Sequence, residues 1–164
     1  MHHQLEVWSG GQSGVDRAAL DVAIELGLPI GGWVPRGRFA EDGGLPARYE
    51  QLRETDSADY AVRTRLNVQD ADATLVLRLG IATGGTLATL DAARRLQRPL
   101  LDIDLERHEA ADAAAAVRSW LDSLFATRSS IRMNVAGPRA SQAPMVYQLT
   151  QRALRLALAS YAAV

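Results

Sequence analysis

The amino-acid sequence predicts a three-layer α/β fold in which helices cover both faces of a parallel sheet. Strand-like runs alternate with helix-like segments along the whole chain, which is typical of parallel sheets with crossover helices. The run 73–79, ATLVLRL, is almost entirely apolar, as expected for a strand buried on both faces. With 164 residues, no linker and no repeat, the chain is expected to form one domain, 1–164.

The first half of the chain is expected to hold two strands, a helix and a long loop. The run LEVW at 5–8 is a short strand, and the helix that follows, at about 14–26, has apolar residues at helical spacing. IGGWV at 30–34 is a second strand, which Pro35 ends. Segment 35–60 shows no sustained period, so we expect a long loop, and such loops are usually functional.

The second half repeats this alternation. A glycine-rich turn follows the strand at 73–79 and leads into a helix whose apolar residues share one face. The other expected elements are a helix at about 61–70, a strand at 99–105, a helix at about 110–126, a strand at 130–137 and a helix at 145–162.

The composition excludes several classes of chemistry. All 18 basic residues are arginine, so the chain has no lysine for a Schiff base, a Walker-type phosphate contact or a general base. It also has no cysteine, which excludes disulfides, thiolate nucleophiles and sulfur ligands for a metal. His2 and His3 are adjacent and His108 is isolated, so no histidine metal site is expected.

Charge and hydropathy argue against nucleic acid and membrane partners. The net charge is −1 and the arginines are spread along the chain, so there is no basic stripe for a nucleic acid. No run approaches the roughly 20 apolar residues that span a bilayer, and the N-terminus lacks the pattern of a signal peptide. We therefore expect a cytoplasmic protein.

Three loops that follow expected strands carry glycine or small polar residues. They are SGGQSG at 9–14, GIATGGT at 80–86 and AGPRAS at 136–141. In a parallel sheet these loops share one edge, and the helices after them offer unpaired N–H groups with a partial positive charge. Small residues let the backbone approach a phosphate there. A single cluster is equally consistent with a tight turn, but three at equivalent positions predict a ligand site.

Several side chains in or near these loops suit an anionic ligand. Arg17 and Arg139 are expected to reach a phosphate with their guanidinium groups. Arg36 and Arg38 flank a glycine in the long loop, and they either close over the ligand or lie in solvent. Asp16 falls in the first turn of a helix, where the helix dipole favours an acid with or without a ligand.

Four motifs together resemble those of the molybdenum-cofactor carrier proteins, a branch of the SLOG superfamily of Rossmann-like folds. They are SGGQSGVDRAALDVAIELGLPIGGWVPRGRFAEDGGLPARY, ETDSADYAVRTRLNVQDADATLVL, TGGT and NVAGPRAS. The resemblance runs in the same order from about residue 7 to 141. It implies a Rossmann-like fold, non-covalent binding of molybdenum cofactor for storage or for transfer to molybdoenzymes, and a homo-oligomer, either a dimer or a tetramer.

The resemblance also implies which residues bind the cofactor, a molybdopterin with a terminal phosphate. By matching motif they are Gly10, Gly11, Gln12, Ser13, Gly14, Thr83, Gly84, Gly85, Thr86, Arg139 and Ser141. Because the chain has no cysteine, no protein sulfur can bind the molybdenum, and the cofactor would be held through its phosphate and pterin. A nucleotide would fit the same loops.

Two other functions of SLOG relatives remain open. Phosphoribohydrolases split nucleoside monophosphates and carry a PGGxGTxxE loop, whose glutamate assists catalysis. The segment 83–91 keeps the first two glycines of this motif. It has Leu87 in place of the third glycine, Ala88 in place of the threonine and Asp91 in place of the glutamate. We therefore expect a binding protein without a catalytic residue, and Asp91 is the alternative. A nucleotide-sensing module is less favoured, because no partner domain is attached.

The final helix offers an independent reason to expect a homo-oligomer. One face carries Leu149, Ala153, Leu156 and Ala157, and another carries Leu154, Leu158 and Tyr161. This is more apolar surface than one sheet face covers. The alternative is a helix buried in a groove of its own subunit.

Overall fold

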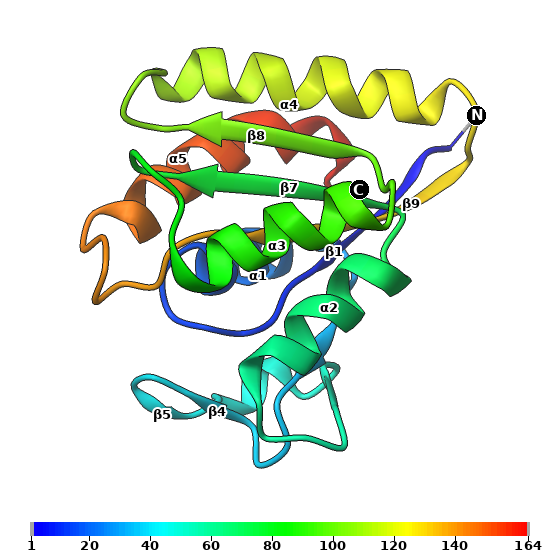
Figure 1. The fold of residues 1–164 in the computed structure, drawn as a ribbon. Helices are drawn as coiled ribbons and strands as arrows, with labels where there is room; N and C mark the ends of the chain where they lie inside the picture. Colours follow the sequence, from blue (N-terminus) through cyan, green and yellow to red (C-terminus); the bar gives the residue numbers. More distant parts are fainter. Residues whose placement is uncertain (1, 164) are drawn as a thin grey trace.

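The computed structural model describes residues 2–163, which form a three-layer α/β fold (Figure 1). The strands of the central sheet are β1 (Gln4–Trp8), β2 (Ile30–Gly31), β7 (Ala73–Arg78), β8 (Leu100–Asp104) and β9 (Ser130–Ala136). They lie in the order β2-β1-β9-β7-β8, and every pair is parallel. The fold class predicted from the sequence is confirmed.

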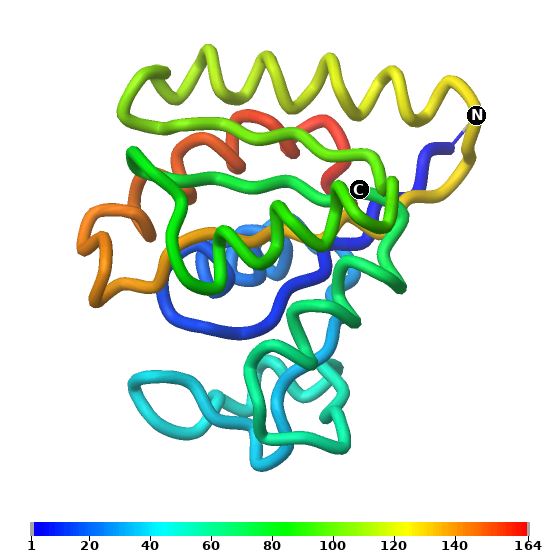
Figure 2. The backbone as a smooth tube through the Cα atoms, in the orientation of Figure 1, coloured from blue at the N-terminus to red at the C-terminus, as the bar shows by residue number. Residues whose placement is uncertain are grey.

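Helices cover both faces of this sheet (Figures 1 and 2). Helices α1 (Val15–Glu25), α4 (Ala110–Phe125) and α5 (Val146–Leu158) pack together on one face. Helices α2 (Tyr60–Asp70) and α3 (Gly84–Arg95) pack together on the other. Side chains on both faces of β7 are fully buried, as expected for a strand covered on both sides.

The last strand of the chain lies in the middle of the sheet. β9 pairs with β1 on one side and with β7 on the other. If β9 is counted first, followed by β1, β2, β7 and β8, the spatial order reads 3-2-1-4-5, which is the order of a doubly wound sheet. The chain is therefore a circular permutation of that topology. Its switch point, where ligands bind in such sheets, lies between β9 and β7.

The strand expected at 30–34 is in fact two strands. β2 ends at Gly31, and β3 (Trp33–Val34) leaves the sheet to pair in parallel with β6 (Arg53–Glu54). Gly32 between them has φ of 123°, and a Cβ there would lie 2.3 Å from the carbonyl oxygen of Ser9. The chain bends at this glycine because no other residue fits so close to that backbone.

Segment 35–60 contains short elements where we expected a loop. β4 (Phe39–Ala40) and β5 (Gly43–Gly44) form a hairpin, and η1 (Ala47–Tyr49), a single 3-10 turn, precedes β6. Figure 2 shows this cyan segment beneath the sheet. Tyr49 anchors it, because its ring is fully buried and its hydroxyl donates a 2.5 Å hydrogen bond to Asp21. Strands of two residues are too short to give a periodic signal.

The final helix is covered by its own subunit. Four of its apolar residues are buried against α1 and α4, namely Ala153, Leu154, Ala157 and Leu158. Leu149 and Tyr161 pack partly buried against the same core, and Leu156 is 52% exposed. The uncovered apolar face that favoured an oligomer is absent from the described part of α5, so a homo-oligomer stays a prediction from the resemblance alone.

Helices able to cross a membrane are absent from residues 2–163, since none is both long and apolar enough.

Candidate functional site

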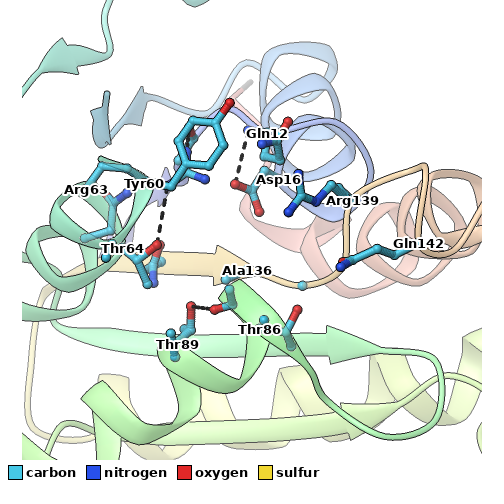
Figure 3. Close-up of a pocket in the computed structure, with 18 residues that line it drawn as sticks. Gln12, Asp16, Tyr60, Arg63, Thr64, Thr86, Thr89, Ala136, Arg139 and Gln142 are labelled. Carbon is cyan, nitrogen blue, oxygen red and sulfur yellow. Dashed lines mark hydrogen bonds between the residues drawn. The ribbon is translucent and has the colours of Figure 1, made fainter. Parts of the chain in front are cut away.

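A cavity of about 280 Å³ opens at the carboxyl edge of the sheet, at the switch point between β9 and β7 (Figure 3). Its walls come from the loop after β1, the end of β9, the beginning of α3 and one face of α2. Figure 3 shows Tyr60, Arg63 and Thr64 on one side of it, and Asp16 and Arg139 across from them. The cavity thus joins residues from both halves of the chain.

The beginning of α3 is open toward this cavity. Thr83 is the N-cap but makes no capping hydrogen bond with its side chain. Its carbonyl oxygen accepts from the N–H groups of Thr86 and Leu87, and within residues 2–163 the N–H groups of Gly84 and Gly85 have no partner. A Cβ on Gly85 would meet no atom within 4 Å. Free N–H groups, the helix dipole and open space together suit an anion.

Arg63 on α2 is a buried cation in the cavity wall. Its residue is only 7% exposed, and its Nη1 donates to the carbonyl oxygen of Gly10. Its Nε donates weakly to Thr64 over 3.4 Å, while Nη2 has no hydrogen-bond partner in the described chain. Burial lowers the pKa of Arg63, but a guanidinium remains charged at neutral pH. A buried charge with a spare donor calls for an anionic partner.

Asp16 on α1 is the acidic residue among those that line the cavity. Its Oδ2 accepts a hydrogen bond from the backbone N–H of Gln12 over 3.2 Å. Burial raises the pKa of Asp16 to about 6, although the positive charges of Arg63 and Arg17 oppose the shift. At neutral pH the carboxylate is mostly ionised and presents an acceptor to a bound molecule.

Six of the residues predicted from sequence line this cavity, namely Gly10, Gln12, Gly84, Gly85, Thr86 and Arg139. The other seven are not in its lining: Gly11, Ser13, Gly14, Arg17, Arg36, Thr83 and Ser141. Thr83 borders a smaller adjoining hollow of about 70 Å³, which shares Thr86 and Gln142 with the cavity.

We expected the glycines of the loops 9–14 and 136–141 to leave their backbone open to an anion. In the structure, glycines of these loops pack against other protein atoms. Gly14 has φ of 82°, and a Cβ there would lie 2.4 Å from the carbonyl oxygen of Pro138. That oxygen also accepts from the N–H of Val15 over 3.3 Å. Gly11 lies against Leu45 of the long segment. These loops are therefore locked together, and the open backbone is at α3.

The polar side chains of those loops contact carboxylates of the β4–β5 hairpin. Ser13 and Ser141 donate to Glu41, and the Nε atom of Arg139 lies 3.9 Å from it. Arg17 forms a two-pronged ion pair with Asp42.

Three charged candidates lie elsewhere. The backbone N–H of Arg36 donates to the carbonyl oxygen of Ser57, and Arg36 is an exposed residue. Arg38 points inward and donates to the carbonyl oxygens of Leu52 and Tyr49, so it does not close over a ligand. Asp91 is 59% exposed and lies 4.0 Å from Arg94 on the same helix. Asp91, the candidate catalytic residue of a phosphoribohydrolase, is therefore outside the cavity.

One face of α2 was missed by the sequence analysis. The cavity is also lined by Tyr60, Arg63, Thr64, Asn67, Thr89, Asn134 and Gln142. The first four recur at i, i+3, i+4 and i+7, so they share one face of the helix. This is the spacing at which a core-facing helix carries apolar residues. A polar stripe there was the signal that could have identified them.

Comparison with known proteins agrees with this architecture. The sequence model of the circularly permutated YpsA SLOG family matches residues 7–158. A crystal structure from Syntrophus aciditrophicus SB, described as "Putative molybdenum carrier protein", is 45% identical to this chain. The match covers 93% of this chain and 94% of that one, with a TM-score of 0.87. No curated protein matches the chain. This chain belongs to the circularly permutated YpsA SLOG family.

Proposed function

We propose that this chain binds molybdenum cofactor non-covalently in the cavity at the switch point, for storage or transfer. The observation that carries the proposal is the open beginning of α3 facing a buried, incompletely paired Arg63 across one cavity. The related protein described as a molybdenum carrier supports the choice of ligand, because nearly the whole of both chains is matched.

The cavity residues fit the two chemical parts of this ligand. Its terminal phosphate suits the free N–H groups of Gly84 and Gly85 together with the cation of Arg139 or Arg63. Its pterin has a planar edge of donors and acceptors, which suits Asp16 and the polar side chains of α2. The chain has no cysteine to bind the metal, so these contacts would hold and orient the organic part of the cofactor.

A nucleoside monophosphate shares this chemistry, because it also joins a phosphate to a flat heterocycle. Hydrolysis of such a nucleotide needs a carboxylate held beside the scissile bond. Asp91 is outside the cavity, and Asp16 accepts from the backbone N–H of Gln12 in the loop before α1. We therefore propose binding without turnover, and a bound nucleotide is the alternative outcome of the test.

Native mass spectrometry of the freshly purified protein tests the proposal. We expect an adduct with the mass of molybdopterin or its molybdenum form. The Gly85→Val variant should lose it, since its side chain fills open cavity space without meeting protein atoms. The Gly44→Val variant is the matched control, because Gly44 also faces open space but lies on the hairpin outside the cavity lining. A nucleotide adduct would replace the cofactor assignment, and equal adducts in both variants would contradict the site.

A further inference from the structure

The Glu41 carboxylate lies among hydrogen-bond donors from two separate loops. Its Oε1 accepts from the hydroxyl of Ser13 and, over 3.1 Å, from the backbone N–H of Ser141. Its Oε2 accepts from the hydroxyl of Ser141 and lies 3.9 Å from Nε of Arg139. Burial by itself raises the pKa of Glu41, but these hydrogen bonds and the Arg139 charge outweigh it, and the pKa lies below its usual value. The surroundings are those of an anion site.

These donors are held in place by the body of the protein. Ser13 directly precedes the tight contact between Gly14 and Pro138 that locks the two loops together. The Ser13 hydroxyl also accepts from the backbone N–H of Ala140 over 3.1 Å. The backbone turn that carries Arg139 and Ser141 is closed by the N–H groups of Gln142 and Ala143, which donate to the carbonyl oxygen of Arg139. The backbone that carries the donors is therefore held by contacts other than those with Glu41.

The carboxylate itself is carried by a slender hairpin. β4 and β5 have two residues each, Phe39 is 56% exposed, and a Cβ on Gly43 or Gly44 would meet nothing within 4 Å. Beyond Glu41, the tip is held by Asp42 through its ion pair with Arg17. The backbone N–H of Glu41 also donates to Oε1 of Gln12 over 2.8 Å. All of these ties are polar, and an anion in solution can compete for the donors that bind the two carboxylates.

We propose that Ser13, Arg139 and Ser141 form a phosphate subsite, which the side chain of Glu41 fills until a phosphate monoester displaces it. This inference rests on the proposed function, because Arg139 also lines the cavity and makes the two sites continuous. The phosphate group of a monoester has three acceptor oxygens and two negative charges, whereas a carboxylate has two oxygens and one charge. The same donors can therefore bind the phosphate more strongly. Displacement removes the contacts by which the Glu41 carboxylate holds the hairpin tip.

Titration with inorganic phosphate measures this competition. The apparent affinity of a site equals its intrinsic affinity multiplied by the fraction of molecules in which the site is open. If the hairpin is closed about ten times more often than it is open, the apparent affinity for phosphate is about tenfold lower. The Glu41→Ala variant should therefore bind phosphate about tenfold more tightly than the wild type, and Glu41→Gln, which keeps the shape, should also bind more tightly. Glu50→Ala removes the same charge from an exposed residue that makes no side-chain contact with this cluster, and it should bind like the wild type.

Two further measurements separate this inference from the proposed function. In the Gly85→Val background the cavity is blocked, yet the gain from Glu41→Ala should remain and should disappear when Ser141→Ala is added. In the wild type, phosphate should speed hydrogen exchange at the Glu41 amide and slow it at the Ser141 amide. Equal or weaker phosphate binding by both Glu41 variants, or exchange that slows at both amides, would show that Glu41 is only a structural tie.

Discussion

Arg63 donates a hydrogen bond from Nη1 to the carbonyl oxygen of Gly10, 53 residues earlier in the chain. This bond joins α2 to the loop after β1, and both residues line the cavity. A Cβ on Gly10 would lie 2.8 Å from the same Nη1 atom. The guanidinium is therefore both a wall of the cavity and the tie that fixes the position of that wall.

Replacing this arginine should affect both ligand binding and stability. We expect Arg63→Met to weaken phosphate-ester binding at least about tenfold and to cost about 1–3 kcal/mol of unfolding free energy, because the Gly10 carbonyl loses its donor. Arg65→Met is the control, since Arg65 lies on the same helix and is exposed. Calorimetric titration and urea unfolding measure the two effects. Unchanged binding in Arg63→Met would remove Arg63 from the site.

The buried carboxyl of Asp16 should make stability depend on pH. Its pKa of about 6 in the folded protein lies above the value of 3.8 for an exposed aspartate, so the folded state favours the protonated form. The resulting stabilisation is complete below pH 4 and is lost as the pH rises through 6. Between pH 4 and pH 7, the unfolding free energy of Asp16→Asn should therefore rise by about 3 kcal/mol relative to that of the wild type. Asp91→Asn, which changes an exposed aspartate outside the cavity, is the matched control in the same urea unfolding series.

Two glycines should respond in opposite ways to an added methyl group. Gly14→Ala should destabilise the protein by more than about 2 kcal/mol, because φ is positive there and the methyl carbon would meet Pro138. Gly85→Ala should be neutral or stabilising by up to about 1 kcal/mol, because its site is open and alanine favours a helix. Thermal and urea unfolding of the two variants check this contrast. Equal destabilisation would contradict the packing described for the two loops.

Asp91 should have no catalytic role. Incubation with purine and pyrimidine nucleoside monophosphates should release only trace base, and Asp91→Asn should leave that trace unchanged, because the side chain points to solvent beside Arg94. Chromatography of the products measures release. Substantial release that disappears in Asp91→Asn would make the protein a phosphoribohydrolase.

The oligomeric state is open to direct measurement. The resemblance to carrier proteins leads us to expect a dimer or tetramer at micromolar concentration, although α5 is covered by its own subunit. Light scattering coupled to size-exclusion chromatography gives the mass. A monomer mass at that concentration would contradict the expectation.

Local periodicity was enough to place the main elements. Apolar residues at spacings of two or about 3.6 show which face of a segment is buried, so the strand at 73–79 and the long helices were found close to their observed bounds. Gly32 shows where this fails. It reads as part of a strand, and only its contact with Ser9 reveals that the strand is broken there.

From the amino-acid sequence alone we could predict the α/β fold, the absence of lysine and cysteine chemistry, and glycine loops at one edge of a sheet. The three-dimensional structure was needed to show that β9 enters the middle of the sheet, that Arg63 completes the cavity and that Glu41 lies among the donors of two loops. One cause underlies all three cases. A spacing pattern records that a side chain is buried or polar, whereas its partner depends on contacts between segments far apart in the chain, which the local pattern does not encode.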